Sequence, residues 1–112
     1  MEFDFSNNGI CPQVTLRGDL DDAAQPALAA RVFPLLADRG SRLVIDLSGA
    51  RRITSAGIGA LVTLVARANT NGSRVILAAP TPFVAGVLKT TRLDTFFEIA
   101  ETVEQAKQRL SS

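Results

Sequence analysis

Two adjacent hydroxyl side chains, Thr54 and Ser55, stand directly before the predicted start of a helix. Ser55 is placed to be the N-cap of that helix, with its oxygen accepting a hydrogen bond from an amide of the first turn. A phosphate on the same hydroxyl would meet free backbone amides and the positive end of the helix dipole. Spacing alone favours the ordinary N-cap, and both interpretations stay open at this point.

Two glycines, Gly57 and Gly59, follow in the first turns of the same helix. Each glycine weakens an α-helix by about 1 kcal/mol relative to alanine. A segment that needed only a cap has no reason to accept this weakness twice. Because glycine has no side chain, the backbone of a partner could approach closely here. We therefore interpret residues 54–59 as a binding segment.

The sequence Gly57-Ile58-Gly59 also invites comparison with nucleotide-binding motifs, because it follows a strand and opens a helix. The third glycine of a dinucleotide fingerprint would fall at Val62, and the turn between strand and glycine is too long for that pattern. No Gly-Lys-Ser or Gly-Lys-Thr occurs, so a P-loop is absent from the sequence. We predict no nucleotide cofactor.

Three carboxylates, Asp19, Asp21 and Asp22, precede the first predicted helix. They could hold a divalent cation, but the cluster lacks an internal glycine and a terminal glutamate at loop spacing. We favour a solvated loop in which Asp21 or Asp22 caps the helix, and we predict no metal site. The pair Arg51-Arg52 could bind phosphate, but a solvated turn is the favoured interpretation.

Composition narrows the chemistry further. The 112 residues include no His, Trp or Tyr and one cysteine, so Ser–His and Cys–His catalytic pairs and the usual zinc sites are excluded, and we predict that the chain is not an enzyme. A formal net charge of +1 gives no reason to expect a nucleic acid or an anionic membrane as partner. With no apolar run of roughly 20 residues and an acidic start unlike a secretory signal, we predict a cytoplasmic protein without membrane insertion.

The elements that position these residues alternate along the chain. Continuous apolar runs at 43–47 and 74–78 predict strands buried on both faces, and Ser48-Gly49 is expected to open a turn after the first of them. Pro34 predicts a break near Phe33 in the first helix, because proline inside a helix costs about 3 kcal/mol. The remaining predicted strands are 3–5, 14–17 and 96–99, with a hairpin turn at 7–9, and the predicted helices are 23–38, 56–70, 82–89 and 101–110.

This order predicts a single α/β domain over residues 1–112. We expect a mixed, mostly parallel sheet of about five strands with about four helices. Right-handed crossovers connect the parallel strands, and the first strand is antiparallel at an edge. Thr81 and Thr102 are expected to cap the last two helices.

The sequence resembles a known family. Asp46-Leu47-Ser48 and the run Ile53–Leu61 are similar to the signature of STAS domains, specifically of bacterial anti-sigma-factor antagonists. Leu16–Asp21 is similar to that family's Gly-Glu-Leu-Asp element, and residues 82–99 and 103–106 to its third helix, last strand and closing helix. The resemblance covers residues 14–110 and implies the STAS fold.

The resemblance also implies a mechanism of partner switching. An unphosphorylated antagonist binds an anti-sigma factor, usually a serine-protein kinase, and so frees a sigma factor for transcription. The kinase phosphorylates the serine that corresponds to Ser55, the phosphate disrupts the complex, and a PP2C-type phosphatase resets the cycle. Asp21 corresponds to a family aspartate near the phosphoacceptor. The implied partner-binding residues are Asp21, Thr54, Ser55, Ala56, Gly57, Ile58 and Gly59.

The chain departs from the family pattern at Thr54, where many phosphorylated antagonists have aspartate, and Thr54 is a second candidate acceptor. Two other functions are considered. A cytoplasmic STAS subunit of a lipid-transport ATP-binding-cassette complex would dock its ATPase through the same helix, and Ser-Ala-Gly occurs in that group too. A nucleotide-binding or hydrolytic protein is disfavoured by the missing P-loop and histidine.

Overall fold

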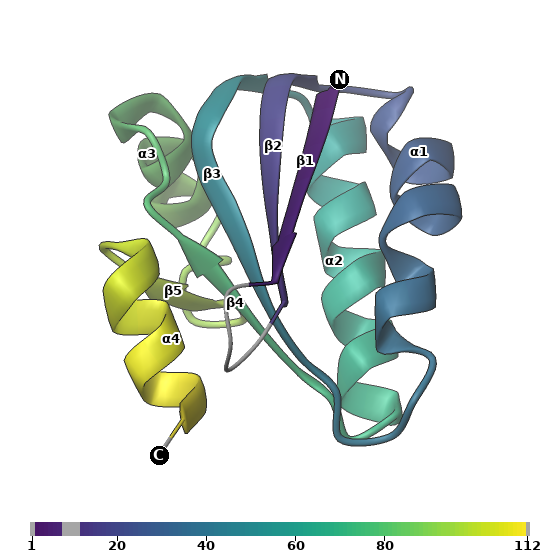
Figure 1. The fold of residues 1–112 in the computed structure, drawn as a ribbon. Coiled ribbons are helices and arrows are strands. Elements are labelled where there is room, and N and C mark those ends of the chain that lie inside the picture. The colour runs from purple at the N-terminus through teal and green to yellow at the C-terminus, as the bar shows by residue number, and fades with distance from the viewer. Residues whose placement is uncertain (1, 8–11, 112) are drawn as a thin grey trace.

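The computed structural model describes residues 2–7 and 12–111, and within these ranges the chain forms one five-stranded sheet with helices on both sides (Figure 1). The strands are β1 (Glu2–Asn7), β2 (Pro12–Leu20), β3 (Arg42–Ile53), β4 (Arg74–Ala78) and β5 (Glu98–Ala100). The helices are α1 (Ala24–Arg31), α2 (Ser55–Thr70), α3 (Pro82–Thr90) and α4 (Val103–Ser111), with a 3-10 turn, η1 (Phe33–Leu36), after α1.

The strands lie in sequence order, β1-β2-β3-β4-β5. β1 is antiparallel to β2, and every later neighbour in this order is parallel. The predicted α/β class, the mixed sheet and the antiparallel edge strand are therefore confirmed. The predicted hairpin turn falls largely on residues 8–11, which lie outside the described part of the chain.

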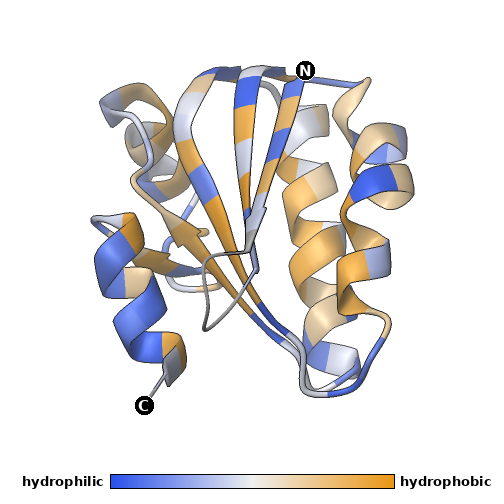
Figure 2. Ribbon diagram, in the orientation of Figure 1, coloured by the Kyte–Doolittle hydropathy of each residue, from blue (hydrophilic) through white to orange (hydrophobic). Residues whose placement is uncertain are grey.

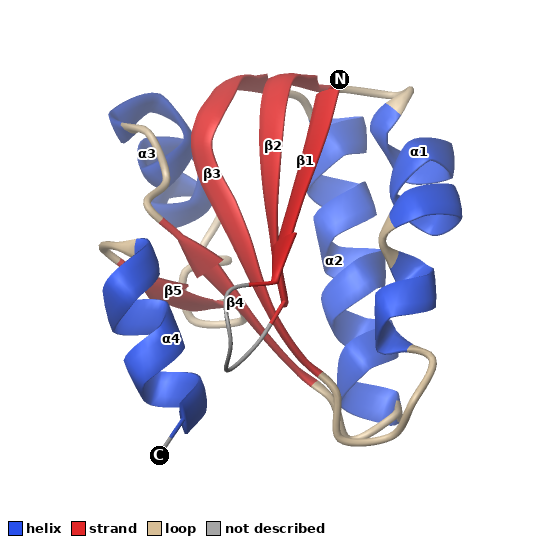
Figure 3. Ribbon diagram, viewed as in Figure 1, coloured by secondary structure: helices blue, strands red, loops and turns tan. Residues whose placement is uncertain are grey.

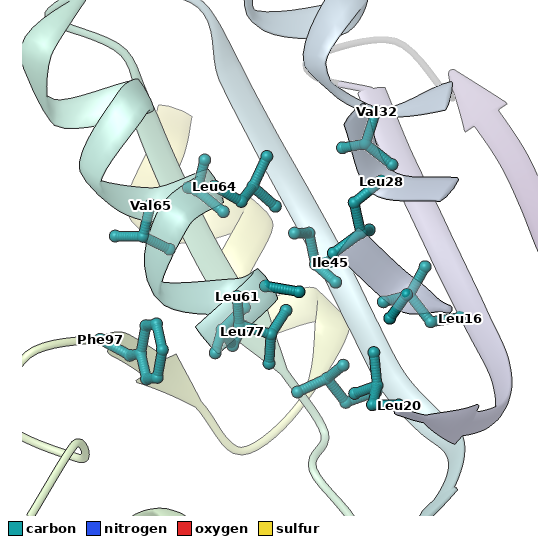
Figure 4. Close-up of a cluster of buried hydrophobic side chains, with 14 of the residues drawn as sticks. Leu16, Leu20, Leu28, Val32, Ile45, Leu61, Leu64, Val65, Leu77 and Phe97 are labelled. Carbon is teal, nitrogen blue, oxygen red and sulfur yellow. The ribbon is translucent and has the colours of Figure 1, made fainter. Parts of the chain in front are cut away.

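The central strands β3 and β4 are buried on both faces at residues 43–45 and 75–78, as their continuous apolar runs predict. Figure 1 shows α1 and α2 side by side on one side of the sheet, with α3 and α4 on the other. Ile45 and Leu77 belong to the larger core, where they lie close to Leu61 of α2 (Figure 4). Val44 and Ile76, one residue earlier on each strand, join a second core with Leu110 of α4 and its neighbours. Among the described residues, no helix has both the length and the apolarity that a membrane span requires.

Pro34 interrupts the first helix close to the predicted position. α1 ends at Arg31, and Phe33–Leu36 continue as η1. Proline has no amide hydrogen and clashes with the preceding turn of an α-helix, so the chain changes to a tighter turn here. The predicted helix over 23–38 is thus shorter than expected, with the break where expected.

β3 corrects the prediction of a turn at Ser48-Gly49. The strand continues to Ile53 and stays paired with β2 through Leu20, although β4 accompanies it only as far as Asp46 (Figure 3). Two register irregularities between β2 and β3 break the usual alternation, so the buried residues fall three apart, at Leu47, Ala50 and Ile53. Because a strand is recognised in a sequence by alternation with a period of two, this spacing of three explains why the second half of β3 was not predicted.

The last elements follow the predicted order with small shifts. β5 begins at Glu98, two residues later than predicted, because Phe96 and Phe97 lie in the preceding turn and bend. Arg74 of β4 holds this edge strand by donating to Glu98 over 2.8 Å and 2.5 Å. These hydrogen bonds lower the pKa of Glu98 and raise the pKa of Arg74.

Threonine caps begin the last two helices, as predicted. The Thr81 hydroxyl accepts from the amide of Val84 over 3.4 Å, and the Thr102 hydroxyl accepts from the amide of Gln105 over 3.1 Å. Each bond satisfies one of the amides that the first turn of a helix leaves without a partner.

Candidate functional site

The ends of β2 and β3 meet the start of α2 at one end of the sheet. Leu20 is paired with Ile53 in the strand register, and the Leu20 carbonyl accepts from the amide of Thr54 over 2.9 Å. Asp21 and Ser55 come after these joined residues, so both leave the sheet at the same place. The structure therefore brings the two predicted regions, the acidic loop and the hydroxyl pair, together.

Thr54, not Ser55, is the N-cap of α2. Its backbone is extended (φ −103°, ψ 173°), and its hydroxyl accepts from the amide of Gly57 over 3.2 Å. The same hydroxyl donates to the Leu20 carbonyl over 3.4 Å. The prediction that Ser55 is the cap is wrong. Thr54 caps α2, and its hydroxyl also links the start of α2 to β2.

Ser55 is the first residue of α2 and is exposed. Its hydroxyl has no hydrogen-bond partner among the described residues, whereas the Thr54 hydroxyl is engaged twice. No acidic residue lies in the first turn of α2. Of the two candidate acceptors, Ser55 is thus the one whose hydroxyl is free to react, at a helix start where negative charge is favourable.

The two glycines of the segment have different surroundings. Gly57 is buried, and a Cβ atom at this position would lie 2.0 Å from the Leu20 carbonyl oxygen. A Cβ atom at Gly59 would meet nothing within 4 Å. The chain's own packing therefore requires glycine at position 57, which the sequence interpretation missed. Only Gly59 is left with an open surface that a partner could approach.

The acidic loop closes a turn and does not cap α1. The Asp21 carboxylate accepts from the amide of Ala23 over 3.1 Å, and the Asp21 carbonyl accepts from Ala24 over 3.0 Å. The N-cap of α1 is Ala23, without a side-chain cap, so the prediction of an aspartate cap is wrong. The turn leaves Asp21 half-buried beside the start of α2.

The charges around this turn are mixed. Arg51 and Arg52 belong to β3 and do not form a turn, and the Arg51 guanidinium lies 4.0 Å from the Asp19 carboxylate. A polar depression of about 550 Å³ lies here, lined by Arg17, Asp19, Asp21 and Arg51 among others. Within the described ranges, no three acidic, cysteine or histidine side chains gather as a metal site would need.

A Thr54→Ala substitution is expected to lower the free energy of unfolding by about 1 kcal/mol, because it removes the cap of α2. Thr63→Ala is the matched control: Thr63 lies in the same helix and donates only to the Gly59 carbonyl within it, so its loss should change stability by less than about 0.5 kcal/mol. Urea denaturation of both variants measures the difference. Equal midpoints would contradict the assignment of Thr54 as the stabilising cap.

Residues 3–103 match a family model described as "Mlab, STAS domain". The chain belongs to the STAS domain family. TM1081 from Thermotoga maritima has a TM-score of 0.87 and 20% sequence identity, with 98% of this chain and 95% of that chain covered. An anti-sigma-factor antagonist from Mycobacterium paratuberculosis has a TM-score of 0.81 and 23% identity, with coverage of 99% and 94%.

A third solved structure is the anti-sigma-factor antagonist SpoIIAA in its unphosphorylated form. It has a TM-score of 0.76 and 21% identity, and 98% of this STAS domain and 96% of SpoIIAA are covered. At these identities the likeness is one of fold. It confirms the predicted STAS fold, which here places Thr54 and Ser55 at the start of α2.

Proposed function

We propose that this STAS domain is an anti-sigma-factor antagonist that binds a serine-kinase anti-sigma factor in the cytoplasm and releases a sigma factor for transcription. Phosphorylation of Ser55 switches the binding off, and a PP2C-type phosphatase restores it. The observation that carries the proposal is the exposed Ser55 hydroxyl, which has no hydrogen-bond partner within the described part of the chain, beside a Thr54 hydroxyl that is already engaged. Anti-sigma-factor antagonists among the structurally similar proteins support it, and one of them, SpoIIAA, is described in its unphosphorylated form.

The proposed interface uses the predicted binding residues in two ways. Ser55 and Ala56 are exposed, and Gly59 has open space where a side chain would lie, so these three contact the partner directly. Asp21, Thr54 and Ile58 border them, and buried Gly57 sets the distance between α2 and β2. A phosphate adds about −1.5 to −2 charge and considerable bulk at the centre of this surface.

The switch then acts on the interface and leaves the fold intact. A phosphate at the first position of α2 faces the positive end of the helix dipole, which favours the helix. A partner fitted closely around Ala56 and Gly59 would lose contacts and would have to desolvate the new charge. Phosphorylation should therefore release the partner without unfolding α2.

Phosphosite mapping tests the proposal. The purified chain is incubated with ATP and a purified serine-kinase anti-sigma factor from the same organism, and the product is analysed by intact-mass and fragment mass spectrometry. We expect one phosphate, on Ser55, and none on the Ser55→Ala variant, while Thr102→Ala, which removes an exposed hydroxyl at the start of α4, is phosphorylated like the wild type. A phosphate on Thr54, or none anywhere, would contradict the assignment.

A second candidate function has one observation in its favour. The matching family model is described as "Mlab, STAS domain", and this description does not mention an anti-sigma-factor antagonist. This supports keeping the STAS subunit of a lipid-transport ATP-binding-cassette complex as the alternative, with the start of α2 docking an ATPase. Affinity purification of the tagged chain from its native cells separates the two: an ABC-type ATPase as the main partner selects this alternative, and a serine kinase selects the first.

A further inference from the structure

The outer face of α1, η1 and α2 carries very little charge. Residues 24–36 include one charged side chain, Arg31, and residues 55–70 include one, Arg67. On the other side of the sheet, residues 82–90 of α3 include one charged side chain, Lys89, and residues 101–111 include four. Figure 2 shows the contrast between the mostly apolar α1 and α2 and the hydrophilic α4. Solvent-facing helices normally resemble α4, so two adjacent helices with one charged side chain each form an unusually apolar surface.

A groove runs between α1–η1 and the C-terminal half of α2. It has a volume of about 680 Å³, and its lining includes Ala29, Phe33, Pro34, Ala37, Arg67 and Thr70. Ala29, Pro34 and Ala37 are exposed, although none of them carries a polar side chain. Arg67 is the charged residue of this lining, and its guanidinium lies 4.9 Å from the ring centre of Phe33. No acidic side chain pairs with Arg67 among the described residues.

The groove and the proposed interface at Ser55 lie toward opposite ends of α2. Small residues follow one another along α2 at helical spacing, at Ala56, Gly59, Thr63 and Thr70. At 1.5 Å per residue, the axis from Ser55 to Thr70 is about 22 Å long, which is the length of a helix of about four turns. A single helix laid along α2 could therefore touch the switch residue at one end and fill the groove at the other.

We propose that the groove between α1–η1 and α2 receives an amphipathic helix of the anti-sigma factor. The apolar stripe of that helix packs on Ala29, Phe33 and Pro34, and one of its carboxylates pairs with Arg67. Charge selects this occupant: the described residues of α1, η1 and α2 offer cations and no anion, and Arg67 is held in place by a ring and not neutralised by an acid. The inference rests on the proposed function and extends its interface beyond the first turn of α2.

Two pairs of matched variants test the groove. Ala29 and Ala30 are neighbouring exposed alanines of α1, of which only Ala29 lines the groove. Ala29→Trp should fill the groove and weaken binding at least tenfold, whereas Ala30→Trp should bind within twofold of the wild type. Arg67→Glu should weaken binding at least tenfold, whereas Lys89→Glu, which reverses an exposed cation near the end of α3, should not.

Isothermal titration calorimetry with the purified serine-kinase anti-sigma factor measures these affinities, and circular dichroism confirms that the variants fold. If Ala29→Trp and Arg67→Glu bind like their controls while the wild type binds, the groove proposal is overturned and the proposed function stands. If the wild type binds no such kinase, both are overturned. If sedimentation equilibrium shows a dimer that Ala29→Trp dissociates, the groove binds a second copy of the chain. That result also overturns the groove proposal.

Discussion

A Gly57→Ala substitution is expected to lower the free energy of unfolding by about 3 kcal/mol, at the upper end of what overpacking costs. The added methyl group would lie 2.0 Å from the Leu20 carbonyl oxygen and 2.5 Å from its carbon. Both are backbone atoms in the paired end of β2, so no side chain can rotate away. Either α2 or β2 must move, and the hydrogen bond between Thr54 and Leu20 would be strained with them.

Gly59→Ala is the matched control, because it makes the same change two residues later in the same helix. The added methyl group there would meet nothing within 4 Å, so the usual preference of a helix for alanine applies. We expect stability to rise by about 0.5–1 kcal/mol. Guanidinium denaturation of the two variants measures the contrast, and a Gly57→Ala protein within about 0.5 kcal/mol of the wild type would contradict a close contact between Gly57 and Leu20.

The order of the elements was predictable because most strands and helices show a clear hydrophobic pattern in the sequence. The buried run of β4 and the threonine caps of α3 and α4 lie where the sequence places them. Pro34 also interrupts the first helix at the predicted place, because it has no amide hydrogen to donate. The second half of β3 was not predicted, because its irregular pairing with β2 places the buried residues three apart instead of two. Such a pattern depends on the partner strand and leaves no local signal.

The site was predictable as a segment but not in its internal division of roles. Two hydroxyls in a row can each cap a helix, and the choice of Thr54 depends on the Leu20 carbonyl, a backbone group that no sequence pattern marks. The buried position of Gly57 follows from the same contact. Leu20 is thus the residue that organises the site, although its side chain only contributes to the core.

These contacts bear on the absence of aspartate before Ser55. A neutral threonine caps α2 here, so the helix start carries no negative charge of its own. A phosphate on Ser55 would then face the helix dipole without a like charge at the adjacent position. Thr54 is therefore compatible with a phosphorylated Ser55, and the chain supplies the cap and the acceptor from two different residues.

A Ser55→Asp substitution is expected to weaken binding of the serine-kinase anti-sigma factor at least about a hundredfold, or about 2.7 kcal/mol. It should leave folding stability unchanged or raise it by about 0.3–1 kcal/mol, because an acid at the first position of α2 interacts favourably with the helix dipole. Ser55→Ala should bind within a few-fold of the wild type, since it adds neither charge nor bulk.

Thr102→Asp is the matched control for the added charge. Thr102 is exposed and caps α4, so the substitution places an acid at the start of a different helix, away from α2. We expect it to preserve both stability and binding. Calorimetric titration and thermal denaturation of the three variants separate the possibilities. Equal binding by Ser55→Asp and Ser55→Ala would remove Ser55 as the switch, and a Ser55→Asp protein that is unfolded would show that charge at this position acts on the fold and not on the interface.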